Sequence, residues 1–315
     1  MLINIAFILL GFLILVKCGD YLVDGAVAIA RRAKLSPMVI GLTVIGFGTS
    51  TPELLVSLNA ALAGSPGIAV GNVVGSNIAN IALILGATGL IVACKTDDRT
   101  LKIDMPFMVG ACCCLAIIGM TGTISRPAGI IGFLMLVAFV TYQIRSSRKR
   151  NEAKSEADAS VEKPMALWLA IVMVVFSIAA MIGGAHLLVR GAREVALALG
   201  VPERVVGLTV VAVGTSLPEL FASVMSARKG ETDMAIGNII GSVSFNVLSV
   251  VGLSSAICPI VGSDEGFLID YALMVFLAFL LWLFLCTKRT LERWEGAVLL
   301  FIYVGYIAYT VVTAA

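Results

Sequence analysis

Two short segments of the chain combine residue types that could bind a metal cation. Each carries the pattern Gly-Thr-Ser-x-Pro-Glu, and each is followed on the next predicted helix by Gly-Asn-x-x-Gly-Ser-x-x-x-Asn. Every polar side chain in these patterns offers oxygen, and none is Lys, Arg, His or Cys. Hard cations such as Ca²⁺ and Na⁺ take oxygen ligands, whereas zinc and copper favour nitrogen or sulfur. The sequence therefore predicts an anionic, oxygen-lined cation site.

The residues of these patterns fall at equivalent places in the two halves of the chain. The first set consists of Gly48, Thr49, Ser50, Pro52, Glu53, Gly71, Asn72, Gly75, Ser76 and Asn80, and the second of Gly214, Thr215, Ser216, Pro218, Glu219, Gly237, Asn238, Gly241, Ser242 and Asn246. Side chains three or four residues apart share one helical face. Ser50 therefore lies on the face of Glu53, and the partner helix carries a stripe of Asn, Ser and Asn, with the same spacing in the second set.

A proline precedes the glutamate in both sets. Proline has no N–H to donate to the carbonyl four residues back, and its ring clashes there. Pro52 and Pro218 therefore predict a kink or an unwound turn just before each glutamate. Such a break frees carbonyl oxygens near Gly46 and Ala212 to face a ligand.

Structural roles compete with cation binding for some of these residues. The glycine pairs are also typical of close contacts between membrane helices, and the hydroxyls could bond their own backbone. A carboxylate at membrane depth costs about 3 kcal/mol even on lenient scales, and here it occurs at two equivalent positions. A purely structural role for Glu53 and Glu219 is therefore the weaker hypothesis.

Long apolar runs must position these patterns. The chain of 315 residues is 59% hydrophobic and 13% charged, which indicates an integral membrane protein. The apolar runs are continuous rather than alternating, which favours an all-α bundle over a β-barrel. We predict ten transmembrane helices, at 3–30, 36–63, 67–93, 102–122, 126–145, 165–198, 202–228, 233–259, 267–287 and 291–313.

The chain is internally duplicated. Residues 39–86 align with residues 205–252 without a gap, so each half carries one copy of both patterns. We expect a first five-helix repeat at 1–147, a hydrophilic cytoplasmic linker at 148–164 and a second five-helix repeat at 165–315. Because five is odd, the second repeat enters the membrane from the opposite side. Such inverted repeats place a shared site near the bilayer midplane.

Basic residues predict the orientation. Most Lys and Arg lie in alternate connections, such as 31–34, 95–102 and 145–163. The positive-inside rule then places both termini outside a multi-pass protein, for which we expect a prokaryotic cytoplasmic membrane.

Other residues indicate structural roles. The lone histidine, His186, is interpreted as a packed side chain, and the cysteines, including the run at 112–114, as small apolar packing residues. Asp20 and Asp24 lie on the first span, where we expect Lys17 to pair with Asp20. Neither HExxH nor GxSxG occurs, so we expect no enzyme, no cofactor and no nucleic-acid partner.

The segments "GTSTPE…GNVVGSNIAN" and "GTSLPE…GNIIGSVSFN" resemble the two alpha repeats of the sodium/calcium exchanger family, within the cation/calcium antiporter superfamily, in its prokaryotic type. The resemblance implies secondary active transport by a monomer in the lipid bilayer, in which Na⁺ moving down its gradient drives Ca²⁺ the other way. It also implies alternating access, with the first and sixth helices sliding across a rigid core.

The resemblance also assigns ligands. Carried over by position, the cation-binding residues are Glu53, Glu219, Thr49, Thr215, Ser50, Ser216, Ser76, Ser242, Asn80, Asn246 and the carbonyls of Gly46 and Ala212, with Glu53 and Glu219 as the central metal ligands. Supporting or helix-breaking positions are Pro52, Pro218, Asn72, Asn238, Gly48 and Gly214. Asn246 departs from the prokaryotic exchangers, which resemble one another in having aspartate there, and this leaves the stoichiometry open.

The sequence leaves two alternatives to sodium-coupled exchange open. The proton-coupled branch of the superfamily typically has an acid three places after the motif asparagine, where this chain has Gly75 and Gly241. That difference favours Na⁺ over H⁺, although a desolvated glutamate can carry a proton. A passive cation channel would use the same oxygens, but two inverted halves in one chain favour a transporter.

Overall fold

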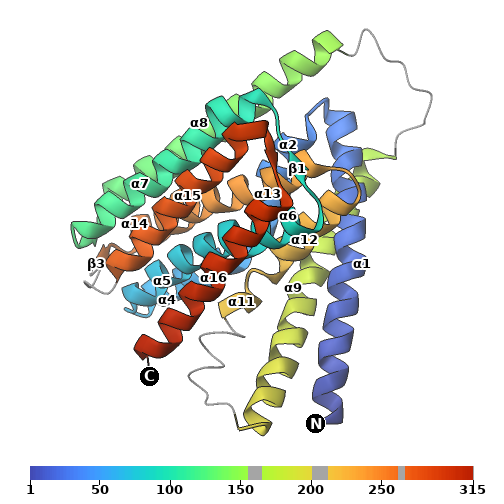
Figure 1. The fold of residues 1–315 in the computed structure, drawn as a ribbon. Coiled ribbons are helices and arrows are strands. Elements are labelled where there is room, and N and C mark those ends of the chain that lie inside the picture. Colours follow the sequence, from blue (N-terminus) through green and yellow to red (C-terminus); the bar gives the residue numbers. More distant parts are fainter. Residues whose placement is uncertain (155–164, 201–211, 262–266, 315) are drawn as a thin grey trace.

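A computed structural model of the chain describes residues 1–154, 165–200, 212–261 and 267–314. It is a helical bundle in which both halves intermingle (Figure 1). The first half contains α1 (Leu2–Ala33), α2 (Pro37–Ile40), η1 (Gly41–Ile45), α3 (Gly46–Thr49), α4 (Thr51–Leu62), α5 (Pro66–Ile78), η2 (Ala79–Leu85), α6 (Gly86–Ile91), β1 (Cys94–Lys95), η3 (Thr100–Asp104), α7 (Met105–Met120), β2 (Thr123–Ile124) and α8 (Arg126–Lys154), where η denotes a π-helical segment.

The elements described in the second half follow the same order. It contains α9 (Leu167–Ala198), α11 (Ala212–Gly214), α12 (Leu217–Arg228), α13 (Thr232–Phe245), η5 (Asn246–Val250), α14 (Val251–Ile257), β3 (Ile260–Val261), α15 (Leu268–Lys288), β4 (Thr290–Leu291) and α16 (Arg293–Ala314). The π-helical segments η2 and η5 begin directly before and at the last asparagine of the two predicted sets, so both halves widen their helix at the same place.

The described residues contain eight helices long and apolar enough to cross a membrane, and a ninth span if the bent pair Pro37–Thr49 and Thr51–Leu62 is counted as one. The protein is therefore an all-helical, multi-pass membrane protein, as predicted. Residues 202–211 of the predicted span 202–228 lie outside the described residues, so the count of ten stays a prediction. The predicted linker, 148–164, begins as helix, because α8 continues to Lys154.

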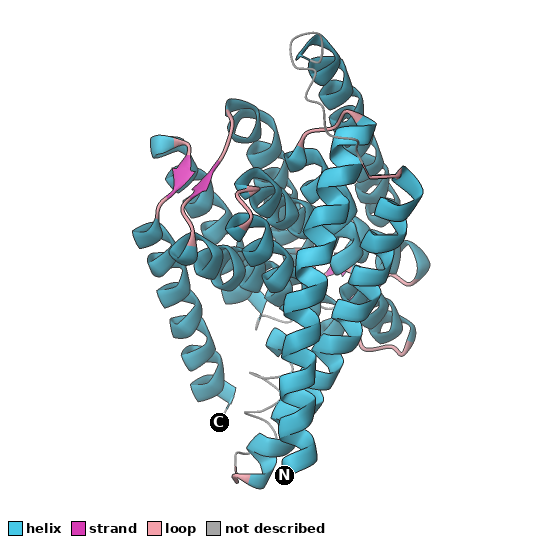
Figure 2. Ribbon diagram, turned by 90° about the vertical axis from the view of Figure 1, so that its right-hand side faces the viewer, coloured by secondary structure: helices cyan, strands magenta, loops and turns pink. Residues whose placement is uncertain are grey.

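The helices α1 and α9 form a closely packed antiparallel pair, which Figure 2 shows side by side. Glycines make the close approach possible: a Cβ on Gly25 would lie 2.9 Å from Val174 Cγ2, and a Cβ on Gly191 would lie 2.9 Å from Ile8 Cγ1. Such small-residue contacts let membrane helices pack without a hydrophobic driving force. Gly25 is equivalent to Gly191, and Val174 is equivalent to Ile8. The two contacts are therefore copies of each other, as a two-fold relation between the halves requires.

Two short strand pairs join the halves. β1 pairs antiparallel with β4, with Cys94 opposite Leu291, and β2 pairs antiparallel with β3, with Ile124 opposite Ile260. β1 and β3 follow equivalent helices of the duplication, and they lie at opposite ends of the bundle (Figure 1). Each half therefore contributes the same strand at a different end.

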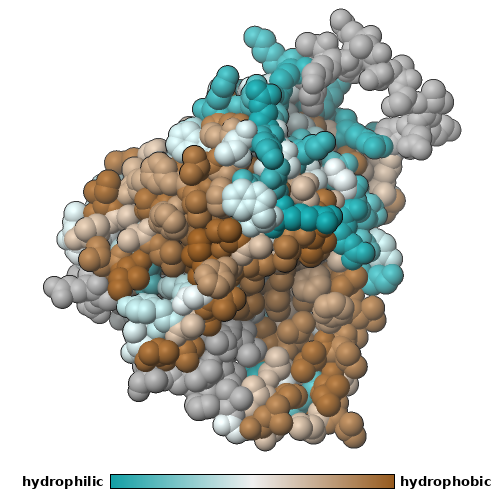
Figure 3. Space-filling model, in the orientation of Figure 1, coloured by the Kyte–Doolittle hydropathy of each residue, from teal (hydrophilic) through white to brown (hydrophobic). Residues whose placement is uncertain are grey.

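The surface divides into an apolar belt and a hydrophilic end. Figure 3 shows apolar residues over the sides of the molecule and hydrophilic ones gathered at the end away from both termini. Large apolar side chains such as Trp168 and Phe301 are exposed. Because lipid tails are the solvent at such a belt, apolar exposure is expected there.

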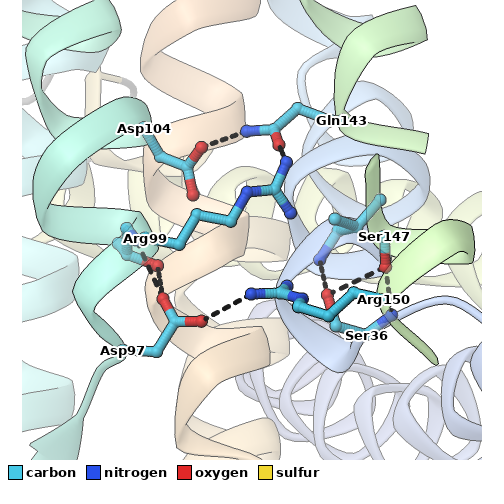
Figure 4. Close-up of polar contacts among 9 residues, drawn as sticks. Ser36, Asp97, Arg99, Asp104, Gln143, Ser147 and Arg150 are labelled. Carbon is cyan, nitrogen blue, oxygen red and sulfur yellow. Dashed lines mark hydrogen bonds and ion pairs between the residues drawn. The ribbon is translucent and has the colours of Figure 1, made fainter. Parts of the chain in front are cut away.

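At the hydrophilic end, a buried polar network joins α8 to the segments that precede α7 and α2 (Figure 4). Gln143 of α8 hydrogen-bonds both Asp104 and Arg99. Next to it, Ser147 Oγ accepts from the Ser36 backbone N–H at 2.8 Å. These bonds satisfy polar groups that would otherwise be costly to bury, and they hold α8 against the start of α2.

The centre of the bundle is formed by α13. The apolar segment Thr232–Ile257 is buried without interruption over residues 234–252, and it packs against η1, α3 and α12. The contact with η1 depends on glycine, since a Cβ on Gly241 would lie 2.7 Å from Leu42 Cα and overlap its carbonyl. The second copy of the polar pattern is thus placed directly against the first.

Candidate functional site

The first predicted helix break is present. The helix axis bends by 44° between Thr49 and Thr51, and Ser50 at the break has φ −82° and ψ 4°. Pro52 stands in the first turn of α4, where its missing N–H leaves no helical bond unmade. The prediction of a kink just before Glu53 is therefore confirmed.

The second half is interrupted at the equivalent place. α11 ends at Gly214, α12 begins at Leu217, and Ser216 between them has φ −91° and ψ 5°. Pro218 again stands in the first turn of the following helix. The same sequence pattern has thus produced the same backbone conformation twice.

Two carboxylates meet at these breaks. Glu53 and Glu219 are each 1% exposed, and none of their four carboxylate oxygens has a hydrogen-bond partner. Glu53 faces Thr215, Glu219 faces Thr49 and Ser50, and the two carboxylates lie close enough for their charges to interact. Each glutamate therefore faces the break of the other half.

Further oxygens without partners surround the carboxylates, again in equivalent pairs. The side-chain oxygens of Ser50, Ser216, Asn80 and Asn246 are buried and accept no hydrogen bond. Buried polar atoms are normally satisfied, because an unpaired one loses its hydration without compensation. Paired sets of unsatisfied oxygens around two carboxylates form a site to which a cation would supply the missing partner.

Asparagines hold the helices that carry the site. Asn72 Nδ2 donates to Ser57 Oγ at 2.8 Å and to the backbone carbonyl of Glu53 at 3.1 Å. Asn238 makes the equivalent bonds in the second half, at 2.9 Å to Ser223 Oγ and 3.4 Å to the carbonyl of Glu219. Both amides thereby hold the turn that bears a central glutamate against the following helix.

The carbonyl of Gly46 takes part in packing between the halves. It accepts from Ser50 N at 3.1 Å and from Ser242 Oγ at 3.5 Å, and a Cβ on Gly46 would lie 3.0 Å from Ser242 N. Ser242 is thereby placed beside the first break. Ala212 begins α11, next to residues outside the described part of the chain.

The predicted hydroxyl ligands have different surroundings. Thr49 Oγ1 donates to the backbone carbonyl of Ile45 at 3.0 Å, and the same side chain lies beside Glu219 of the second half. Ser76 is buried on α5. Thr215 is half-buried and lines a cavity of about 100 Å³, together with Pro52, Pro218 and His186 of α9.

Helix α9 covers both breaks. A Cβ on Gly48 would overlap the side chain of Ile178, and a Cβ on Gly214 would overlap that of Val189. Both glycines are thus required for the close approach of α9.

Two features were not predicted correctly from the sequence. The expected pairing of Lys17 with Asp20 is wrong: Lys229, after α12, pairs with Asp20 at 3.7 Å and with Asp24 at 2.7 Å. Asn77, which belongs to neither pattern, accepts a hydrogen bond from Asn246. The sequence gives one sign of it, a polar residue at a position beside Ser76 and near Asn80 in a largely apolar helix.

Comparison with known proteins agrees with this geometry. The family described as sodium/calcium exchanger protein matches residues 3–145 and 169–312. The chain is 36% identical to the putative antiporter CaxA of Alkalimonas amylolytica, over 97% of this chain and 98% of that protein. It is 33% identical to the sodium/calcium exchanger MaX1 of Methanosarcina acetivorans, over 97% of both proteins.

A solved structure has the same fold. The sodium-calcium exchanger NCX_Mj, soaked with zero Na⁺ and Ca²⁺, superposes with a TM-score of 0.84 at 29% identity, over 98% of this chain and 99% of that one. The resemblance seen in the two glycine-rich patterns is therefore confirmed over nearly the whole length. The chain belongs to the sodium/calcium exchanger family.

Proposed function

We propose that this protein is a secondary active antiporter that exchanges Na⁺ for Ca²⁺ at a site between the two helix breaks. The observation that carries the proposal is the paired set of buried oxygens without partners around Glu53 and Glu219. Two carboxylates give the site a formal charge of −2, which one Ca²⁺ neutralises. Competition between Ca²⁺ and Na⁺ for the same oxygens couples their movements.

Each donor type has a distinct part in this exchange. Glu53 and Glu219 supply charge, and the hydroxyls of Ser50, Ser216, Ser76 and Ser242 replace water around the ion. Asn80 and Asn246 add neutral oxygens, and Thr49, Thr215 and the carbonyls of Gly46 and Ala212 complete the predicted ligand set. Because no basic side chain neutralises either carboxylate in the described structure, the cation itself provides the counter-charge.

We further propose ten helices arranged as two inverted repeats that work as a monomer. The internal alignment, the glycine contacts exchanged between α1 and α9, and the strand pairs β1–β4 and β2–β3 at opposite ends support this arrangement. The basic, hydrophilic end faces the cytoplasm of a prokaryotic cell by the positive-inside rule, so both termini lie outside.

The test is radiolabelled Ca²⁺ uptake into proteoliposomes loaded with Na⁺, with K⁺-loaded and acid-inside vesicles as controls. Uptake should require internal Na⁺ and should be lost in Glu53→Gln. Uptake driven only by the proton gradient would identify a Ca²⁺/H⁺ antiporter instead. Uptake indifferent to both gradients would indicate a passive channel and would exclude exchange.

A further inference from the structure

A buried hydrogen-bonded relay leads from the site to a helix that does not contribute a ligand. Asn246 Nδ2, at the start of η5, donates to Asn77 Oδ1 of α5 at 3.1 Å. Asn77 Nδ2 in turn donates to Met274 Sδ of α15 at 3.5 Å. All three side chains are 0% exposed, so water does not compete for these bonds.

The chemistry of the last partner fixes the direction of the relay. A thioether sulfur can accept a hydrogen bond but cannot donate one. The amide nitrogen of Asn77 must therefore face Met274, which turns its oxygen toward Asn246. Asn246 must then present its nitrogen to Asn77, and its own oxygen points the other way.

The free end of Asn246 is the oxygen that lacks a partner. Asn246 Oδ1 is buried and accepts no hydrogen bond, like the carboxylates of Glu53 and Glu219. A cation is attracted by the oxygen of an amide and repelled by its NH₂ group, so the rotation of this amide decides whether it is a ligand. A carboxylate at this place would need no such control, because both of its ends are oxygen.

The relay belongs to one half only. Val243 occupies the place equivalent to Asn77 and is fully buried, so an apolar residue is compatible with that position. Asn80, the equivalent of Asn246, therefore has no side-chain acceptor for its amide at the equivalent position. The two amides of the site, alike in the duplicated pattern, therefore differ in this contact.

We propose that Asn77 is a positioning residue that orients the Asn246 amide with its oxygen toward the cation and thereby sets the affinity for Ca²⁺. The inference rests on the proposed function, in which Asn246 is a cation ligand. Asn77 does not touch the ion; it acts through the one bond to Asn246, which Met274 directs.

The experiment compares Asn77→Val in two backgrounds, the natural chain and Asn246→Asp. Equilibrium binding of radiolabelled Ca²⁺ to the purified full-length protein is the primary measurement, and Na⁺-driven uptake is the second. Asn77→Val should weaken Ca²⁺ binding by about tenfold in the natural background. That is the scale expected when one hydrogen bond that orients a cation ligand is lost. In Asn246→Asp it should change binding by less than about twofold.

The two backgrounds test whether Asn77 acts through the Asn246 amide, because an aspartate at that place has no N–H to donate to Asn77 Oδ1. Equal loss of Ca²⁺ binding in both backgrounds would show that Asn77 acts by another route, such as packing, and would overturn the proposal, as would unchanged binding in the natural background. Met274→Leu should act in the same direction and less strongly, and unchanged binding in that variant would overturn the part given to Met274. If Asn77→Val does not accumulate in folded form, Asn77→Ala in the same two backgrounds carries the comparison.

Failure of this proposal is distinct from failure of the proposed function. If the natural protein takes up Ca²⁺ without regard to Na⁺, sodium-coupled exchange fails while the binding comparison still tests the relay. If exchange is normal and the two backgrounds respond alike, only the relay fails.

Discussion

The sharpest quantitative consequence of the site concerns the removal of one carboxylate charge. Glu53→Gln keeps the shape of the side chain and replaces an anion that has no partner among the described residues. Its loss weakens every bound cation, but in proportion to the cation's charge. We therefore expect the affinity of the variant for Ca²⁺ to fall far more than its affinity for Na⁺.

Coulomb's law gives the scale. At a separation of about 4 Å and an effective dielectric constant of about 20, one negative charge attracts a monovalent ion by ~4 kcal/mol and a divalent ion by ~8 kcal/mol. The free energy of burying Glu53 is the same whichever ion binds, so it cancels in the comparison. The remaining difference of ~4 kcal/mol corresponds to roughly a thousandfold loss of preference for Ca²⁺ over Na⁺.

The assay is equilibrium binding of radiolabelled Ca²⁺, with displacement by Na⁺, for the natural protein, Glu53→Gln and Glu219→Gln. Glu295→Gln is the matched control, because Glu295 is also buried, at 2% exposed, but accepts from Glu292 N at 2.8 Å at the start of α16. The control should keep its ion preference. Equal loss of affinity for both ions in Glu53→Gln would refute direct coordination and would indicate that the glutamate acts through the fold.

Three further outcomes follow from the same contacts. Asn238→Ala removes two buried hydrogen bonds and should lower the free energy of unfolding by about 1–2 kcal/mol, measured by thermal unfolding without ions, and weaken Ca²⁺ binding. Gly241→Ala should cost about 1–3 kcal/mol, because its methyl group meets the Leu42 backbone, and an unchanged unfolding midpoint would contradict this packing. Burial, with a smaller contribution from the charge of Asp233, raises the pKa of the Cys94 thiol to about 12, so Cys94 should resist maleimide at pH 8, as checked by mass spectrometry.

The helix breaks and the central carboxylates could be predicted because local rules determine them. A proline cannot make the helical bond to the residue four places back, whatever surrounds it, so Pro52 and Pro218 mark the breaks in any fold. Glu53 and Glu219 are recognisable because a charge in an apolar run costs free energy, so its presence indicates a function. Neither effect depends on which helices lie nearby.

Pairings between distant segments could not be predicted in this way. Lys17 is close to Asp20 along the same helix, which made their pairing a reasonable expectation. In the structure Lys229, far away in the sequence, reaches both Asp20 and Asp24, because α12 ends against α1. The charges and their spacing along one helix do not predict that α12 packs against α1.

Equivalent residues of the duplicated pattern have different surroundings in the structure. Gly48 and Gly214 hold equivalent places, and a strict two-fold relation would set one against α9 and the other against α1. Both instead meet α9, at Ile178 and at Val189. Meanwhile Phe12, the α1 residue equivalent to Ile178, packs edge-on against Phe221 of α12, with ring centroids 5.6 Å apart. The pair α1–α9 is therefore displaced from the symmetric position over the two breaks, and this asymmetry arises from tertiary placement, since the two motifs alone would predict none.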